Sequence, residues 1–390
     1  MERKIYEIPY GTKDILPGEM KIRRAIENKI INVFCKWGYD EVKTPSFEYA
    51  DIFKITDKES DFRFFDRNNN LLALRNDMTA PIARVAANRL QDENKIKRLC
   101  YLASLYRYEN IQAGKQCEFE QAGVELFGAS GAAADAEVIV LAAESLQAAG
   151  IKNFTISLGH IGFIDGLCHD AGLNQEQIRS VKENLRRHDA VAMEEIAASL
   201  TEAGSQLQNI FSRLLFLQGK QELLDELATA LQLQGKKVSK ALDDLRQIYN
   251  LVKAYGYGDY VSFDLGLNRS LDYYTGMLFE IYLPELGFSV AGGGRYDRMM
   301  DKFGMDCPAT GFALGIERII LALERQGALD YSRRWDVFVA WGEGNIVQAI
   351  VKADALRKEG RSVKLAVEPM TLQQAAEQVS SNCCCSLVYV

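Results

Sequence analysis

Two arginines of the chain carry the side chain best suited to holding phosphate oxygens. Arg107 lies in LYRYENIQ and Arg318 lies in GFALGIERI. A guanidinium is a rigid, planar group that donates two parallel hydrogen bonds to a phosphate or to a carboxylate. Residue type alone favours a structural ion pair over a phosphate site, because Glu109 and Glu317 stand close to the two arginines in the sequence.

Three consecutive glycines, Gly292 to Gly294, follow the strand-like segment FSV. Without side chains they allow the backbone to come close to a ligand or to a neighbouring strand. They do not have the spacing of a dinucleotide-binding motif, and no Lys-Ser or Lys-Thr pair completes a phosphate-binding loop. A tight strand crossing and the floor of a ligand site explain them equally well.

The eight cysteines and three histidines form no metal-site pattern. There is no CxxC pair and no cysteine–histidine spacing that suits zinc. Cys383 to Cys385 are expected to alternate between the two faces of a terminal strand, so they could not all bind one metal ion. We interpret the cysteines as reduced, mostly packed thiols and His160, His169 and His188 as structural residues. We therefore predict no metal site, no cofactor and no catalytic residue.

The composition indicates a globular protein. A chain of 390 residues with 48% hydrophobic content is long enough for two or three domains. The first residues, MERKIYEIPYGTKD, are charged, and no run approaches the about 18 apolar residues of a membrane span. We expect a cytoplasmic protein with no membrane association. The net charge of −7 gives no sign of a nucleic-acid-binding surface.

The periodicity of apolar residues predicts the elements that position these side chains. The first third mixes helical patterns with strand-like runs, without regular βαβ spacing, which is typical of an antiparallel sheet carrying helices. The next region is helical throughout, and the last residues, from WDVFVAW to CCSLVYV, follow a βαβαβ pattern. We predict an α+β fold with a core of residues 1–174 and 256–328, an inserted helical domain of residues 175–255, and a small α/β domain of residues 335–390.

Five segments carry a resemblance to a known family. They are GTKDILP from Gly11, YRYENIQAGKQCEFEQAGVELFG from Tyr106, LNRSLDYYTGMLFEIY from Leu267, AGGGRYDRM from Ala291 and GFALGIERI from Gly311. Their sequences and their order resemble those of histidyl-tRNA synthetases, from Gly11 to about Leu323. The resemblance implies a class II aminoacyl-tRNA synthetase-like antiparallel sheet with helices, and self-association as a dimer through this core.

The resemblance also implies a pocket for histidine. Asp77 and Glu125 match positions that hold the ammonium group of the amino acid, and an ammonium is stabilised by carboxylates. Arg107 and Arg318 match the arginines of motifs two and three that hold ATP, so the resemblance favours a vestigial nucleotide-binding site over an ion pair for both. The implied histidine-binding residues are Asp77, Arg107, Gln121, Glu125, Arg269, Tyr273 and Tyr274.

Three departures from the synthetase pattern indicate a change of function. LRNDMTAPIAR replaces the LRPEGT of the synthetases, and its DMTAPIAR part resembles the regulatory subunit of ATP phosphoribosyltransferase; Asn76 replaces a proline that is usual in both families. Cys117 stands where the synthetases have a second arginine, and a thiol cannot neutralise a triphosphate. The C-terminal domain resembles an anticodon-binding domain truncated after its third strand, with no excess of basic residues, so we expect no tRNA.

These departures favour a regulatory subunit without independent catalysis. The resemblance implies that it joins the short-form catalytic subunit of ATP phosphoribosyltransferase in a hetero-octamer, which performs the first step of histidine biosynthesis. It also implies that free histidine is the effector. An active histidyl-tRNA synthetase is the alternative, favoured by Arg107, Arg269, Arg318 and the tyrosines. A synthetase-like module that regulates another partner is a third hypothesis.

Overall fold

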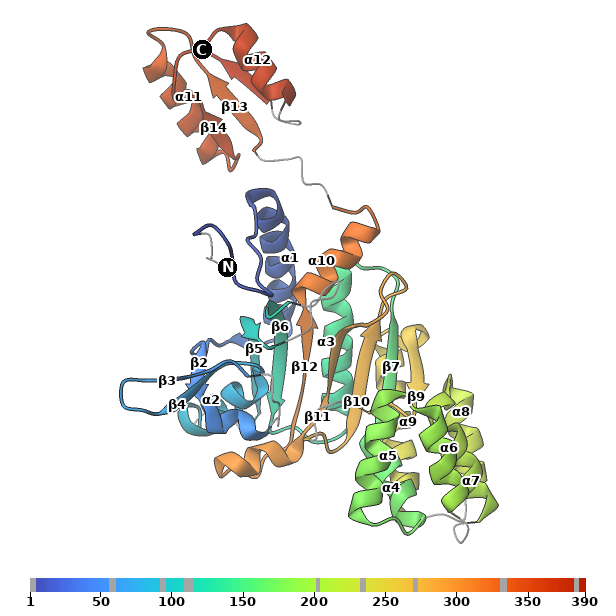
Figure 1. Cartoon of the computed structure of the whole chain (residues 1–390). Coiled ribbons are helices and arrows are strands. Elements are labelled where there is room, and N and C mark those ends of the chain that lie inside the picture. Colours follow the sequence, from blue (N-terminus) through green and yellow to red (C-terminus); the bar gives the residue numbers. More distant parts are fainter. Residues whose placement is uncertain are drawn as a thin grey trace. The chain divides into compact units, whose positions relative to one another are not determined.

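The computed structural model describes residues 5–55, 61–91, 96–108, 116–200, 204–231, 236–268, 273–329, 335–381 and 386–390 (Figure 1). The chain divides into two compact units. One consists of Met1–Thr12 and Ile26–Gln326, and the other of Lys13–Ala25 and Gly327–Val390, so the division falls inside helix α1 (Pro17–Lys36). The predicted site residues all belong to the larger unit.

A nine-stranded sheet in the described part of the chain forms the framework of the larger unit, in the order β1-β5-β6-β12-β11-β10-β7-β9-β8. Its central strands are antiparallel, as predicted. The strands are β1 (Asp40–Glu41), β5 (Lys97–Tyr106), β6 (Glu118–Phe127), β7 (Thr155–His160), β8 (Gln218–Gly219), β9 (Val261–Asp264), β10 (Met277–Tyr282), β11 (Ser289–Arg295) and β12 (Ala309–Gly315).

Two pairs of strands depart from the predicted antiparallel arrangement. β1 is parallel to β5, and β7 is parallel to β9, so the sheet is mixed. Parallel neighbours need a long crossover connection. Both pairs have one, because residues 42–96 separate β1 from β5 and a series of helices separates β7 from β9.

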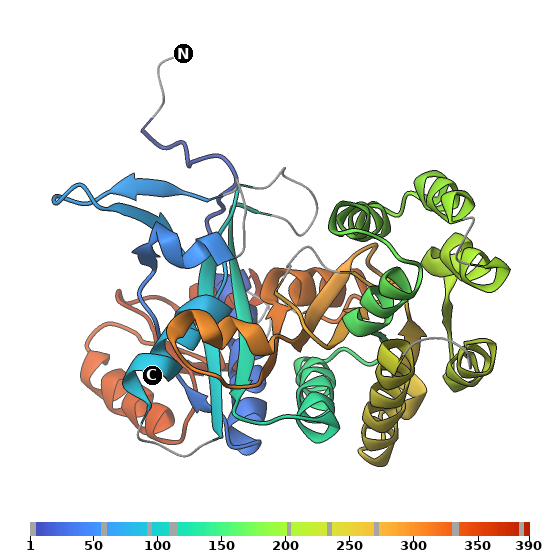
Figure 2. The ribbon, with the colours of Figure 1, turned by 90° about the horizontal axis from the view of Figure 1, so that it is seen from below.

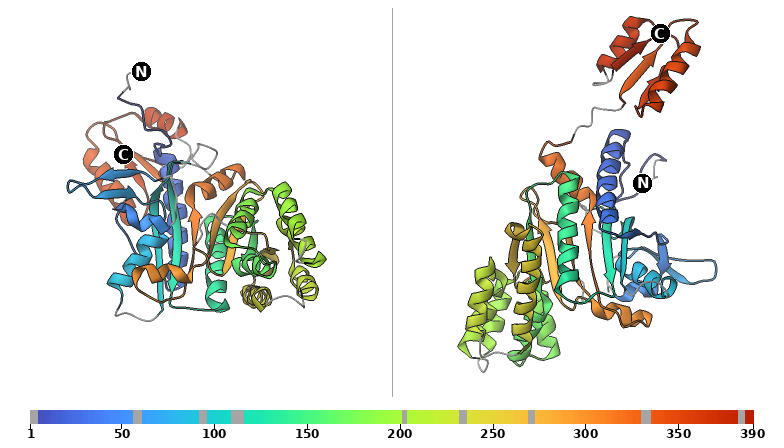
Figure 3. Two further views of the ribbon diagram at one scale, coloured as in Figure 1. Left: turned by 60° about the horizontal axis from the view of Figure 1, so that its bottom comes forward. Right: turned by 180° about the vertical axis from the view of Figure 1, so that it is seen from behind.

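Helices cover both faces of this sheet. On one face α3 (Ala132–Ala149) packs against α9 (Lys236–Ala254), as the view from behind in Figure 3 shows. On the other face α2 (Thr79–Arg89) and the 3-10 helix η4 (Asp297–Phe303) pack over β5, in a core that includes Ile82, Leu99 and Met299. Helix α10 (Ile316–Arg325) follows β12 directly and buries its apolar side.

The region predicted as a helical insertion consists mainly of helices, which Figure 2 shows gathered at one end of the sheet. Its short strand β8 pairs with β9, so the region contributes to the main sheet and belongs to the same compact unit. The boundaries of the three domains stay a prediction. The helices within residues 175–255 are α5 (Gln175–Arg187), α6 (Ala190–Ser199), α7 (Ser205–Arg213), α8 (Gln221–Ala230) and α9, with the 3-10 helix η2 (Leu214–Phe216). Helix α4 (Ile161–Asp170) precedes this region and the 3-10 helix η3 (Gly258–Tyr260) follows it.

A small antiparallel sheet precedes α2 in the chain, with strand order β2-β4-β3. It contains β2 (Phe47–Tyr49), β3 (Arg63–Phe65) and β4 (Leu71–Leu74), and the 3-10 helix η1 (Ala50–Ile55) follows β2. Since β4 is separated from α2 by only four residues, this sheet fixes where the segment containing Asp77 begins.

The C-terminal residues form the predicted βαβαβ unit. Its parallel sheet has the order β14-β13-β15, with β13 (Val337–Ala340), α11 (Ile346–Lys358), β14 (Val363–Leu365), α12 (Leu372–Ser381) and β15 (Ser386–Tyr389). The prediction for Cys383 to Cys385 lies outside the described residues. Among the helices that are described, none is long and apolar enough to cross a membrane.

Candidate functional site

A cavity of about 110 Å³ lies on the face of the main sheet opposite to α3. Thr310 of β12 contacts Asp135 of α3, so the next residue, Gly311, and its cross-strand partner Glu125 belong to the other face. The cavity is lined by Asp77, Thr79, Tyr101, Arg107, Gln121, Glu125, Tyr273, Tyr274, Gly292, Tyr296, Gly311, Phe312 and Ala313.

Six of the seven residues predicted to bind histidine therefore lie around one cavity. They come from the segment just before α2, from the residue that follows β5, from β6 and from the segment before β10, which are far apart in the sequence. The seventh, Arg269, lies outside the described residues. Arg318, predicted for a vestigial nucleotide site, is not among the residues that line this cavity.

Strand β6 presents two of these side chains on the same side. Gln121 and Glu125 are four residues apart, and side chains in a strand alternate between its faces. Between them Gly123 pairs with Tyr101 of β5, and a Cβ atom at Gly123 would clash with the Tyr101 ring. The absence of a side chain at Gly123 therefore allows the tyrosine ring to lie across β6 beside the cavity.

Glu125 is the most deeply buried carboxyl group of the cavity, with 2% of its surface exposed. The pKa of this carboxyl is raised to about 8, chiefly by burial and also by the nearby charge of Asp77, while hydrogen bonds from Tyr296 and Thr79 oppose the rise. The Tyr296 hydroxyl donates to Glu125 Oε2. A carboxyl with this pKa is mostly protonated at neutral pH in the ligand-free protein.

The two carboxylate oxygens of Asp77 have different surroundings. Its Oδ1 accepts hydrogen bonds from the backbone N–H groups of Thr79, at 2.7 Å, and Ala80, at 3.4 Å, at the start of α2. An aspartate in this position satisfies N–H groups that have no partner within the helix. Among the described residues, Oδ2 accepts no hydrogen bond. The shorter side chain therefore stabilises α2 and keeps one oxygen for a ligand.

A hydrogen bond joins the side chain of Arg107 to the backbone of Asn76. Arg107 Nε donates to the carbonyl oxygen of Asn76 at 2.7 Å, and its guanidinium lies 5.3 Å from the centroid of the Phe119 ring. The Asn76 side chain is buried and donates to Asp61 Oδ1. These bonds fix the backbone at Asn76, where the related families have proline, and they hold Arg107 at the cavity beside Asp77.

The surroundings of Cys117 and Arg318 differ from those expected in a working nucleotide site. Cys117 is 3% exposed, and its backbone N–H donates to the Gly11 carbonyl at 2.8 Å, so the position of the synthetases' second arginine holds a buried thiol. Arg318 Nη1 donates to the Ser289 carbonyl at 2.5 Å. Its guanidinium lies 5.1 Å from the centroid of the Phe288 ring.

Tyrosine side chains form much of the cavity wall. The rings of Tyr273 and Tyr274 have centroids 4.8 Å apart, and Tyr273 meets Tyr296 edge to face at 5.7 Å. Burial raises the pKa values of Tyr101, Tyr273 and Tyr296, so their hydroxyl groups remain protonated donors. Tyr101, Tyr296 and Thr79 were not predicted from the sequence as site residues. Tyr296 lies two positions after Gly294 in AGGGRYDRM, and this position near the glycines was the only feature of the sequence that pointed to a site residue.

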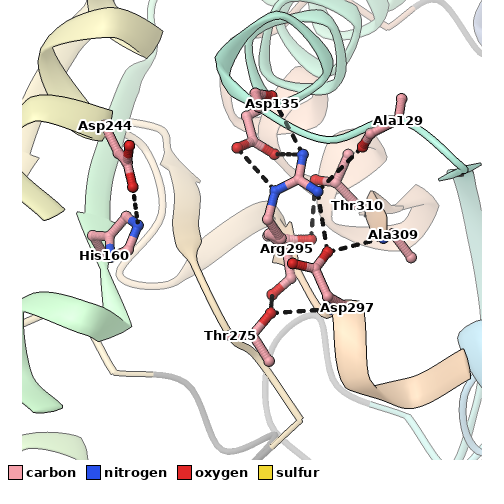
Figure 4. A network of polar contacts seen from close by, with 11 residues as sticks. Ala129, Asp135, His160, Asp244, Thr275, Arg295, Asp297, Ala309 and Thr310 are labelled. Atoms are coloured by element: carbon pink, nitrogen blue, oxygen red, sulfur yellow. Dashed lines mark hydrogen bonds and ion pairs between the residues drawn. The ribbon is translucent and has the colours of Figure 1, made fainter. Parts of the chain in front are cut away.

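A buried polar network supports this wall from behind (Figure 4). Arg295 Nη2 lies 2.8 Å from Asp135 Oδ1, and Arg295 Nε donates to Asp135 Oδ2 at 3.1 Å. Asp297 Oδ1 accepts from Arg295 Nη1 at 3.1 Å, and its backbone N–H donates to Thr275 Oγ1 at 3.0 Å. Because Thr275 follows Tyr274 and Arg295 precedes Tyr296, the network holds two segments of the wall together.

No group of His, Cys, Asp or Glu side chains in the described ranges could hold a metal ion. The cavity itself offers two carboxyl groups, an arginine, an amide and tyrosine hydroxyls, which can form hydrogen bonds and ion pairs with a ligand. Such a set suits a small zwitterion with an ammonium, a carboxylate and further donors or acceptors.

The fold and the order of these residues match a known class of protein. Residues 11–319 match the family model described as histidyl-tRNA synthetase. A structure of an ATP phosphoribosyltransferase regulatory subunit/histidyl-tRNA synthetase from Bacillus halodurans C has a TM-score of 0.88 and 31% identity, with 100% of both chains covered. Histidyl-tRNA synthetase from Nostoc sp. PCC 7120 has a TM-score of 0.86 at 20% identity, covering 100% of this chain and 92% of that one. The protein thus has a class II aminoacyl-tRNA synthetase-like α+β fold, as predicted.

Two more similar relatives identify the family within this class. The ATP phosphoribosyltransferase regulatory subunit of Desulforamulus reducens is 41% identical over 359 residues, which cover 92% of this chain and 89% of the relative. The regulatory subunit of Moorella thermoacetica is 39% identical over 382 residues, 96% of each chain. The chain belongs to the family of ATP phosphoribosyltransferase regulatory subunits. Membership confirms the predicted regulatory class over the alternative of an active histidyl-tRNA synthetase.

Proposed function

We propose that this regulatory subunit senses free histidine in the cavity and transmits its occupancy to a catalytic ATP phosphoribosyltransferase in the first step of histidine biosynthesis. The observation that carries the proposal is the convergence of Asp77, Gln121 and Glu125 with Tyr273 and Tyr274 around one cavity. An amino acid offers an ammonium to the carboxyl groups and a carboxylate to Arg107. An imidazole ring suits a pocket of tyrosine rings and hydroxyls.

The two carboxyl groups differ in a way that suits a sensor. Asp77 keeps one oxygen without a hydrogen bond within the described residues, so it offers a partner for the ammonium at little cost. Glu125 holds a proton near neutral pH and releases it when a positive group approaches. We place both carboxyl groups at the ammonium, with Glu125 as the group whose charge state changes.

The proposed assembly contains the short-form catalytic subunit, which supplies the chemistry, and pairs of this chain joined through the synthetase-like core, together forming a hetero-octamer in the cytoplasm. Histidine binding shifts the assembly between states of different activity by an amount set by its differential affinity for them. Neither tRNA nor a cofactor takes part. Cys117, a buried thiol in place of an arginine, supports this absence of adenylate chemistry.

Calorimetric titration with histidine tests the binding part of the proposal. The chain should bind histidine saturably, Glu125→Ala should abolish binding, and Glu118→Gln should leave it unchanged, since Glu118 is an exposed residue of the same strand. Unaltered binding by Glu125→Ala would reject the cavity as the histidine site.

Activity measurements test the remaining part. The short-form phosphoribosyltransferase should become active when mixed with this chain, and histidine should inhibit the mixture containing wild-type chain but not the one containing Glu125→Ala. The chain alone should not exchange labelled pyrophosphate into ATP in the presence of histidine. Exchange would contradict the proposal, because it requires a working synthetase site.

A further inference from the structure

A second cavity lies beside helix α5, with a volume of about 460 Å³. We call it the α5 cleft, and it is lined by Ile161, Gln175, Ile178, Arg179, Lys182, Glu183, Arg186, Asn268, Tyr274 and Leu278. Its size falls within the roughly 300–1,000 Å³ of cavities that hold small organic ligands. Neither the predicted histidine pocket nor the vestigial nucleotide residues account for it, apart from the shared Tyr274.

Helix α5 is held firmly at the edge of the cleft. Its N-terminus has a capping box, in which Asn174 Oδ1 accepts from the Gln177 N–H at 3.0 Å and Gln177 Oε1 accepts from the Asn174 N–H at 2.9 Å. In its middle, the Lys182 carbonyl accepts a hydrogen bond from Asn268 Nδ2 at 2.7 Å. Since Asn268 lies beyond β9, this bond ties α5 to the residues that follow a strand of the main sheet.

The wall that α5 contributes is positively charged. Arg179, Lys182 and Arg186 recur at helical spacing along one side, against a single carboxylate, Glu183, in a chain whose net charge is −7. Arg186 contacts Glu183, and Lys182 Nζ lies 2.7 Å from Asp165 Oδ1. Arg179 forms no ion pair within the part of the chain that the structure describes. Such an arginine is ordinary on an open surface, but this one lines a cavity with two further cations.

Other residues make the cleft suitable for an organic molecule and not only for an ion. Ile161, Ile178 and Leu278 offer apolar surface, and the amide groups of Gln175 and Asn268 are donors and acceptors. An apolar surface beside a cationic wall matches a molecule with a ring or carbon skeleton at one end and phosphate at the other.

We propose that the α5 cleft binds a small phosphorylated metabolite, whose phosphate oxygens are held by Arg179, Lys182 and Arg186. The volume of about 460 Å³ suits a small molecule better than RNA. The even balance of acidic and basic residues in positions 175–255 is also unlike the extended positive surface that a nucleic-acid backbone requires.

The two cavities share the side chain of Tyr274. A ligand in the α5 cleft therefore touches a residue that also lines the amino-acid cavity. If the amino-acid cavity binds histidine as proposed above, we expect the two ligands to be coupled through Tyr274, and any change that one makes in the affinity of the other is reciprocal. This coupling rests on the proposed function, whereas phosphate binding in the α5 cleft does not.

The experiment is a calorimetric titration of the full chain with inorganic pyrophosphate and with ATP, at low and at high salt. Wild type should bind at least one of them saturably, and more weakly at high salt. Arg179→Glu should weaken binding about tenfold or more, since it replaces a charge-assisted hydrogen bond by a repulsive charge. Arg187→Glu is the matched control, because Arg187 lies in the same helix but not in the cleft. It should bind like wild type.

Three outcomes would overturn the proposal. One is the absence of saturable binding of either probe to wild type. Another is a loss of binding in Arg318→Ala but not in Arg179→Glu, which would move the phosphate to the vestigial nucleotide residues. The third is binding of a short RNA duplex that depends on Arg179 while both small probes fail. Histidine titrations of the same variants separate a failure here from a failure of the histidine pocket, because Arg179 does not line the latter.

Discussion

The hydroxyl group of Tyr296 donates a hydrogen bond to the carboxyl group of Glu125, and both residues are almost completely buried. Glu125 keeps this partner whether it is protonated or ionised, because a carboxyl oxygen accepts in both states. Burial nevertheless raises its pKa to about 8. The charge state of Glu125 is therefore poised near neutral pH, where a bound ammonium can change it.

Histidine binding should strengthen with pH below about 8. If the complex needs the ionised carboxylate, the dissociation constant should fall roughly eightfold between about pH 6.8 and pH 8, where the histidine imidazole is mainly neutral. Calorimetry in two buffers of different ionisation enthalpy should also detect the released proton. Glu125→Gln should bind weakly and without this dependence. A wild-type dissociation constant that stays level across the range would refute the coupling.

The same carboxyl group should lower the stability of the ligand-free protein at high pH. Its pKa in the folded state, about 8, lies above the ordinary value of 4.5, so the folded state binds more protons between these limits. The free energy of unfolding must therefore fall as pH rises through this window. Glu125→Gln keeps an acceptor for Tyr296 but cannot ionise. Urea unfolding at pH 6 and pH 8 should show the variant gaining about 2 kcal/mol relative to wild type.

The control for this prediction is Glu118→Gln, at an exposed residue of the same strand. Its stability should follow that of wild type at both values of pH. Parallel pH profiles for wild type and Glu125→Gln would show that the carboxyl group of Glu125 ionises alike in the folded and unfolded chains.

Much of the fold could be predicted because its signals are local. The alternating runs of β5 and β6 and the helical period of residues 175–255 are present in short stretches of sequence. The parallel neighbours β1 and β9 could not be predicted in this way. They are two and four residues long, and the long-range pairing that joins them to β5 and β7 decides their direction.

The candidate site, like the fold, could be predicted only where the sequence pattern is local. Motif order identified Asp77, Gln121 and Glu125, and the structure brings them together. Tyr101 was missed because its ring reaches the cavity only through its register with Gly123, a fact of pairing between strands. Arg295 was missed because its partner, Asp135, is 160 positions away and belongs to a helix on the other face of the sheet.

The buried ion pair of Arg295 with Asp135 should be essential to stability. Asp135→Ala would leave the buried guanidinium without its main partner, at a cost of about 3–5 kcal/mol in the free energy of unfolding. Urea unfolding measures this cost. The double variant Asp135→Ala with Arg295→Met should lose less than the sum of the two single variants. Additive losses would indicate that the two side chains do not act as a pair.

Gly311→Ala should damage the cavity and the sheet together. A Cβ atom there would meet Glu125 Oε2 and the Val124 carbonyl, and the backbone of paired strands has little room to move. We expect a loss of about 1–3 kcal/mol in the free energy of unfolding, as for other overpacked sites, together with weaker histidine binding. Gly287→Ala is the matched control, because a Cβ at this exposed glycine meets nothing within 4 Å. Urea unfolding and calorimetry on both variants test the prediction, and equal behaviour of the two would mean that the strand accommodates the methyl group without displacing Glu125.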